Sequence, residues 1–159
     1  MTPREAIEIR PATTDDADAI CRVAIRTLRV SNARDYPAEV IAELAAGFTP
    51  QRIAAFIAGR PFFVAIAHGT IVGTANLDGA TARAVFVDPD HQGKGVGTSL
   101  MAAVETLARA RSATTLHVQS SITAEGFYKR LGYVCVGEEI RGSDRTIPME
   151  KRLAPDAAG

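Results

Sequence analysis

Tryptophan is absent from this sequence, and cysteine and histidine are scarce, with two and three copies. Cys21 and Cys135 stand far apart and form no CxxC or mixed Cys/His spacing, so neither a zinc site nor a disulfide framework is expected. We predict that both cysteines are reduced thiols in the core. The three histidines fall on separate predicted elements and give no metal-ligand pattern, so we expect no metal.

Net charge and long apolar runs are missing as well. Eighteen basic residues balance eighteen acidic ones, which leaves no overall field to draw the protein onto nucleic acid or an anionic membrane. No run of about 18 apolar residues occurs, and the N-terminal residues lead into no signal-like apolar segment. We therefore expect a cytoplasmic protein without a nucleic-acid or membrane partner.

What is present is the composition of an ordinary globular protein, with 47% hydrophobic and 23% charged residues. A chain of 159 residues suits one domain, which we expect to span residues 1–159 with a core from about 6 to 153. Hydrophobic periodicity predicts strands at residues 6–10, 62–66, 71–77, 82–87, 114–118, 133–136 and 146–152. It predicts a helix that ends near residue 30, helices at about residues 38–46 and 50–58, a long helix that ends near residues 109 and 111, and a helix at residues 122–131. This order is typical of a mixed-sheet α/β or α+β fold.

A glycine-rich loop joins the predicted strand at 82–87 to the following long helix. Its sequence is Gln92-Gly93-Lys94-Gly95-Val96-Gly97. Glycines let the backbone N–H groups converge, and the first turn of a helix adds unpaired donors and the positive end of its dipole. The loop therefore indicates a phosphate or pyrophosphate site, with a purely structural tight turn as the alternative.

Two familiar phosphate-binding loops do not match this spacing. A Walker A loop has Ser or Thr after Gly-Lys, whereas Gly95 follows Lys94 here, and the dinucleotide fingerprint needs Gly or Ala at Thr98. Further along the chain lies a second pattern, Ala124-x-x-Phe127-Tyr128-Lys129-x-x-Gly132-Tyr133.

Together the Gln92–Gly97 loop and the Phe127–Tyr133 run resemble the GNAT superfamily, whose members transfer an acetyl group from acetyl-CoA to an amine. The resemblance covers about residues 7–153. It implies a mixed, mostly antiparallel sheet of about six to seven strands flanked by helices, with the fourth and fifth strands splayed apart. It also implies acetyl-CoA as co-substrate and a primary amine, on a small molecule or a peptide, as acceptor.

The same resemblance implies roles for individual residues. The positions implied for binding acetyl-CoA are Val85, Phe86, Val87, Gln92, Gly93, Lys94, Gly95, Val96, Gly97, Thr98, Ser99 and Ser121. Tyr128 is the implied acid that protonates the departing thiolate, although a tyrosine in this apolar run also fits a core position. Asn32 and Tyr36 are implied acceptor-site residues, because family members bind acceptors near the first helices.

The general base is not assigned by the sequence. Some members carry a glutamate early in the fourth strand, but residues 81–84 hold no carboxylate. Asp78, His117 and Glu125 are hypotheses for proton conduction, and each also fits a surface position. With no activated nucleophile, we expect direct attack in a ternary complex. The alternatives are a noncatalytic acyl-CoA-binding or sensing module and a protein-interaction domain, and a homodimer is compatible with the terminal strands.

Overall fold

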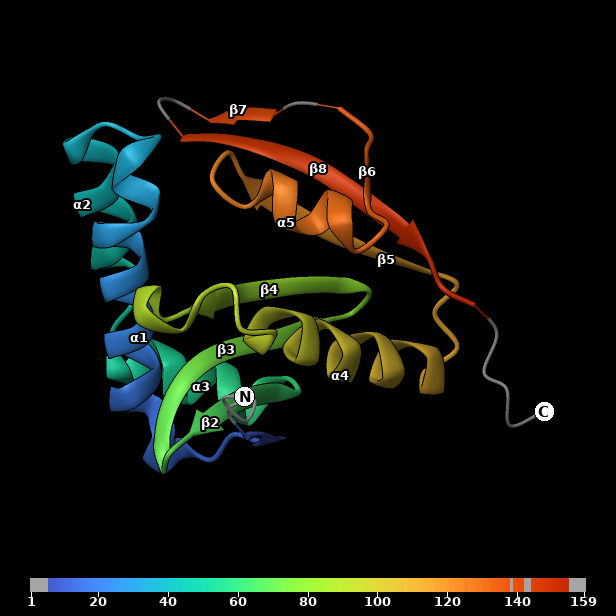
Figure 1. The fold of residues 1–159 in the computed structure, drawn as a ribbon, viewed down its shortest axis with the longest axis horizontal. Helices are drawn as coiled ribbons and strands as arrows, with labels where there is room; N and C mark the ends of the chain where they lie inside the picture. Colours follow the sequence, from blue (N-terminus) through green and yellow to red (C-terminus); the bar gives the residue numbers. More distant parts are fainter. Residues whose placement is uncertain (1–5, 138, 142–143, 155–159) are drawn as a thin grey trace, which may run out of the picture.

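The computed structural model describes residues 6–137, 139–141 and 144–154 (Figure 1). The strands are β1 (Ile7–Pro11), β2 (Phe62–Ala67), β3 (Thr70–Asp78), β4 (Thr81–Val87), β5 (Thr115–Ser121), β6 (Val134–Cys135), β7 (Glu139–Arg141) and β8 (Asp144–Arg152). The helices are α1 (Ala17–Val30), α2 (Ala38–Ala46), α3 (Pro50–Gly59), α4 (Val96–Ala110) and α5 (Glu125–Arg130), with 3₁₀ turns at Thr14–Asp16, Asn32–Arg34 and Pro89–His91.

The strands form one sheet in the order β1-β2-β3-β4-β5-β8-β6, with β7 paired to β8. All pairs are antiparallel except β4 and β5, which run parallel. Over the described length of both strands, β4 and β5 pair only through Thr81 with His117 and Ala82 with Val118. Beyond that point they separate, as Figure 1 shows. The predicted mixed sheet with splayed fourth and fifth strands is confirmed, and the additional strand is β7.

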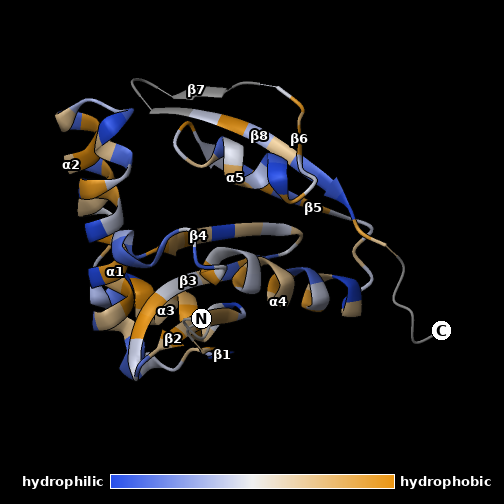
Figure 2. Cartoon of the chain, in the orientation of Figure 1, coloured by the Kyte–Doolittle hydropathy of each residue, from blue (hydrophilic) through white to orange (hydrophobic). Residues whose placement is uncertain are grey.

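Helices cover both faces of the sheet because their apolar residues recur on one side. On α4, Leu100, Met101 and Val104 are buried on the side that packs against β2, β3 and β4. On the other face, α1 and α3 pack Ile20 and Ile53 against the start of β2. Figure 2 shows hydrophobic and hydrophilic residues interleaved along α1 and α2, as expected for helices with one buried side.

A β-bulge interrupts β4 where it leaves β5. Thr74 pairs with Phe86 and Asn76 with Arg83, so β4 has one residue more than β3 over this stretch. Ala84 lies within the bulge with a φ of +51°, which is unusual for a residue with a side chain. The Thr74 hydroxyl donates to the Ala84 carbonyl at 2.7 Å and holds this conformation. The bulge therefore redirects the β4 main chain at the start of the gap.

Two sequence predictions need correction. Cys21 is buried, but Cys135 is exposed because it lies on β6, a two-residue strand at the sheet edge. The helix predicted from residue 122 begins at Glu125, since residues 121–124 form a turn. In the part of the chain that the structure describes, no single helix is long and apolar enough to cross a membrane; α2 and α3 reach that length only as a pair bent by 60°.

Candidate active site

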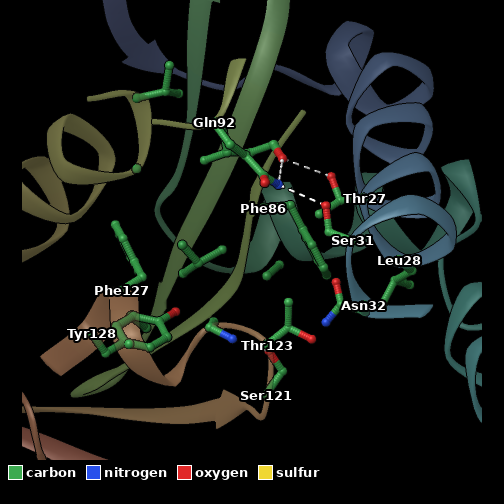
Figure 3. Close-up of a pocket in the computed structure, with 18 of the residues that line it drawn as sticks. Thr27, Leu28, Ser31, Asn32, Phe86, Gln92, Ser121, Thr123, Phe127 and Tyr128 are labelled. Atoms are coloured by element: carbon green, nitrogen blue, oxygen red, sulfur yellow. Dashed lines mark hydrogen bonds between the residues drawn. The ribbon is translucent and has the colours of Figure 1, made fainter. Parts of the chain in front are cut away.

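A cavity of about 660 Å³ lies where β4 and β5 separate (Figure 3). Its walls come from α1, the Asn32–Arg34 turn, α2, β4, the glycine loop, the start of α4 and the β5–α5 segment. The predicted site residues that line it are Asn32, Tyr36, Val85, Phe86, Val87, Gln92, Gly93, Gly95, Val96, Gly97, Thr98, Ser121 and Tyr128. Lys94 and Ser99 lie outside the lining.

The glycine loop delivers the chain to the N-terminus of α4 in an open conformation. Gly93 and Gly95 have φ of +77° and +86°, which favours glycine, and a Cβ at either position would meet no atom within 4 Å. The N–H of Ser99 donates to the Gly95 carbonyl at 3.0 Å and is the first amide of α4 used within the helix. The amides of residues 96–98 precede it and have no partner inside the helix, so they can receive an anion.

Gly97 is required for a different reason, which is close packing. A Cβ built on it would lie 2.9 Å from two ring carbons of Phe127 and 3.4 Å from Val87 Cγ2. The Phe127 ring in turn meets Tyr128 edge to face, with ring centroids 5.1 Å apart. The first turn of α4 and the helix that carries Tyr128 are therefore packed directly together.

The Gln92 side chain fastens the loop to α1 (Figure 3). Its Nε2 donates to Ser31 Oγ at 3.0 Å and to the Val87 carbonyl at 3.1 Å. The hydroxyl of Thr27 shares its one hydrogen between the Val23 carbonyl at 2.7 Å and the same Val87 carbonyl at 3.1 Å. The end of β4, the loop and α1 therefore share one hydrogen-bond network, which the glycine spacing did not predict.

An ion pair reinforces this junction. Arg26 Nη1 lies 2.6 Å from both Asp88 carboxylate oxygens, and its Nη2 lies 3.1 Å from Asp90. Partial burial by itself would raise the pKa of Asp88. Hydrogen bonds from Arg26 and from the Asp90 amide outweigh burial and hold that pKa below its usual value.

Strand alternation decides which β4 amides face the cavity. The Asp88 N–H donates to the Val72 carbonyl on β3 at 2.8 Å, so the main chain of Phe86, two residues earlier, also faces β3. The main chains of Val85 and Val87 then face the open edge. The Phe86 side chain reaches the cavity instead, where its ring meets Phe48 edge to face at 5.3 Å. Phe86 therefore lines the cavity with its side chain, whereas Val85 and Val87 turn their main chains toward it.

Tyr128 reaches the cavity from α5 with its ring buried between Phe127 and Tyr133. Burial raises the pKa of the Tyr128 phenol, so the group stays protonated at neutral pH. No described residue hydrogen-bonds with its hydroxyl, which faces the open space in Figure 3. Tyr133 is different: its hydroxyl donates to Glu105 at 2.7 Å, and Lys151 bonds the same carboxylate at 3.0 Å.

Two contacts close the cavity on its other side. The Ile122 N–H donates to the Tyr36 hydroxyl at 2.8 Å, and the Thr123 hydroxyl donates to Asp35 at 2.7 Å. They join the segment after α1 to the turn before α5. Ser121 stabilises that turn by accepting from the Ala124 N–H at 3.1 Å.

The three residues suggested for proton conduction lie elsewhere. Asp78 is 3.0 Å from Arg83, His117 is 3.6 Å from Glu150, and Glu125 is 3.2 Å from Lys129. None belongs to the described cavity lining. Across residues 6–137, 139–141 and 144–154, no three His, Cys, Asp or Glu side chains gather as metal ligands would.

Comparisons with known proteins agree with this geometry. A family model described as an acetyltransferase (GNAT) domain matches residues 32–153. The peptidyl-lysine N-acetyltransferase YjaB of Salmonella typhimurium is 27% identical over 154 residues, which cover 94% of this chain and 99% of that protein. A GCN5-related N-acetyltransferase from Rhodopseudomonas palustris superposes with a TM-score of 0.89 at 29% identity, covering 96% of this chain and 99% of that one.

The PaiA N-acetyltransferase from Thermoplasma acidophilum, solved in complex with coenzyme A, has the same fold. Its TM-score is 0.78 at 20% identity, covering 92% of this chain and 99% of that one. Because the family model spans most of the sequence, this chain belongs to the GNAT superfamily of acetyltransferases and is an acyltransferase.

Proposed function

We propose that this protein transfers the acetyl group of acetyl-CoA to a primary amine by direct attack within a ternary complex. The observation that carries the proposal is the cavity, which extends from the open N-terminus of α4 to the hydroxyl of Tyr128 between separated strands. Acetyl-CoA supplies an activated thioester there. We infer as well that residues 6–153 act as one catalytic domain.

The donor side of the cavity suits a long phosphorylated thioester. The amides of residues 96–98 would hold the pyrophosphate, and the open space above Gly93 and Gly95 leaves room for it. The Val85 carbonyl and the Val87 N–H would bond the pantetheine amides, because β5 leaves that edge of β4 unpaired. The Val87 carbonyl is already taken by Gln92 and Thr27. The Val85 N–H, beside the bulge at Ala84, is our choice for the donor to the acetyl carbonyl oxygen.

The acid–base steps follow from the groups in the cavity. As the C–N bond forms, negative charge on the acetyl oxygen would be stabilised by the Val85 N–H. As the C–S bond breaks, Tyr128 would donate its phenol proton to the thiolate. The proton lost by the substituted amine would return to Tyr128 through water. This route needs the amine to arrive uncharged, since the described lining offers no carboxylate base.

Replacing Tyr128 by phenylalanine tests the acid. We expect Tyr128→Phe to lower kcat about a hundredfold and to change the acetyl-CoA Kd less than about threefold, because only the proton is removed. Since burial raises the pKa of Tyr128, its ionisation should cause no fall in wild-type kcat between about pH 8 and 10. Stopped assays of thiol release with an amine panel measure both quantities.

Tyr133→Phe is the matched control. It removes a hydroxyl from the neighbouring ring, which lies outside the cavity lining, so kcat should stay within about twofold while stability falls. Unchanged turnover of Tyr128→Phe under conditions limited by chemistry would reject the acid role.

Acetylation of Cys21 or Cys135 on the turnover timescale, followed by intact mass, would reject direct attack. Tight acetyl-CoA binding without turnover of any amine would favour the sensing module, which the carboxylate-free lining suggests.

A further inference from the structure

The part of the cavity beside α1 and α2 has apolar walls. We call it the acceptor pocket and define it by Leu28, Asn32, Tyr36, Leu44, Phe48 and Phe86, all of which line the cavity. Leu28 and Tyr36 are buried, while Leu44, Phe48 and Phe86 are half-buried and keep part of their surface toward the open space. The walls therefore offer apolar surface to whatever reaches the thioester from this side.

One polar group in the acceptor pocket lacks a partner. The Asn32 side chain projects between Phe86 and Thr123 in Figure 3, and the residue is only 8% exposed. Its main-chain carbonyl accepts from the Asp35 N–H at 2.9 Å, but its carboxamide hydrogen-bonds with no described residue. Its amide atoms are not among the fully buried atoms that lack a partner, so the carboxamide keeps contact with the open space, where a ligand or water can bond it. Its position therefore points to a polar group of the acceptor.

The charged residues that line the cavity limit which charges the acceptor can carry beyond its reacting amine. Its described lining contains Arg83, Arg130 and His91 but no aspartate or glutamate. Asp35 is not part of the lining; it is exposed beside the cavity, where its carboxylate accepts from the hydroxyl of Thr123 at 2.7 Å. A second ammonium group drawn into this space would lose its water without gaining a carboxylate.

We infer that the acceptor is a primary amine on an apolar stem with no second positive charge near it, and that the Asn32 carboxamide orients the amine by accepting one of its N–H groups. This inference rests on the proposed function. An alkylamine or arylalkylamine carries this chemistry, and so does a lysine side chain within a peptide. Polyamines and aminoglycosides do not.

An acceptor panel tests the class directly. Thiol release from acetyl-CoA is measured with hexylamine, phenethylamine, a peptide with one internal lysine and a blocked N-terminus, and spermidine. We expect kcat/KM for the best apolar-stem amine to exceed that for spermidine at least tenfold. Comparing the peptide with the small amines shows whether the acceptor is a lysine side chain or a free amine. A protein that acts on lysine side chains needs the peptide main chain on either side, whereas one that acts on free amines does not.

Two variants test the pocket. Asn32→Ala should lower kcat/KM for the best amine about tenfold, as expected for one lost hydrogen bond, and leave the acetyl-CoA Kd unchanged. Leu44→Asp places a carboxylate in the wall and should reduce the preference over spermidine at least tenfold. Ala46→Asp adds the same charge at an exposed position of α2 and should leave the preference unchanged.

The outcomes separate the two claims. Turnover of spermidine above every apolar-stem amine, still dependent on Tyr128, would overturn the inference and keep the proposed function. Wild-type kinetics in Asn32→Ala would overturn the assigned role of its carboxamide. Acetyl-CoA binding with no turnover of any amine would overturn both.

Discussion

Substitution of Gly97 by alanine offers a sharp test of how the α4 terminus meets α5. The added Cβ would lie 2.9 Å from two Phe127 ring carbons, closer than real Cβ contacts. Carbon atoms pack best about 3.5–4.0 Å apart, so the ring must retreat by roughly 0.6–1 Å. Because Tyr128 follows Phe127 on α5 and Gly97 carries one of the α4 amides, this movement disturbs both sides of the donor site.

The expected magnitude comes from two opposing effects. Alanine favours a helix over glycine by up to about 1 kcal/mol, whereas overpacking costs about 1–3 kcal/mol. We therefore expect Gly97→Ala to lower the unfolding free energy by up to about 3 kcal/mol. If the strain falls on the binding site, the acetyl-CoA Kd rises about 5- to 150-fold, the equivalent of 1–3 kcal/mol. Chemical denaturation and calorimetry measure these quantities.

Controls separate this packing effect from the general consequence of losing a glycine. Gly59→Ala adds a Cβ at the end of α3 with no atom within 4 Å, so affinity should not change. Phe127→Leu removes the two ring carbons that clash, so the double variant with Gly97→Ala should recover part of the lost affinity. Wild-type affinity and stability in Gly97→Ala would refute the reasoning.

Two further predictions concern the junction with α1. Gln92→Ala removes both hydrogen bonds from Nε2 and should raise the acetyl-CoA Kd about 5- to 30-fold with kcat unchanged. Ser31→Ala removes one of the two bonds and should have a smaller effect. Equal affinity of wild type and Gln92→Ala by calorimetry would contradict this prediction. Arg26→Gln removes the strongest of the interactions that lower the Asp88 pKa and leaves the bond from the Asp90 amide. A carboxylate whose pKa is lower in the folded state stabilises the fold at pH values above its unfolded pKa of about 3.9, and this stabilisation is lost as the pH falls through the folded pKa. Because the variant lacks most of this stabilisation, it should unfold at a higher pH than the wild type during acid titration. Coincident acid transitions of wild type and variant would oppose that assignment.

Several elements follow from local sequence because their determinants are local. The predicted helix at residues 38–46 has the bounds of α2, and α3 begins where Thr49 accepts from the Arg52 N–H, with Pro50 in the first turn. The glycine loop was predictable for the same reason, since left-handed φ angles and a helix start are encoded within a few residues. The resemblance to the family added the splay between the fourth and fifth strands, which periodicity alone did not predict.

Other features depend on residues far apart in the chain. The turn at 121–124 replaces the predicted start of α5, where the Ile122 N–H is taken by Tyr36 and the Ala124 N–H by Ser121. The apolar residues on either side of Cys135 in the sequence predict a core position, but its strand lies at the edge of the sheet. Neither outcome is visible in periodicity, because both are set by what packs against the segment.

The sequence by itself determined the glycine-rich loop at the start of a helix, the pattern of helices and strands, and the position of Tyr128 in its motif. Only the tertiary structure decided that Gln92 is held by Ser31, that Gly97 faces Phe127, and that Asn32 enters an apolar pocket. The physical reason is the separation along the chain of the residues that interact. Hydrogen-bond and steric preferences within a turn act between neighbours in sequence, whereas these contacts join segments that meet only when the helices dock on the sheet.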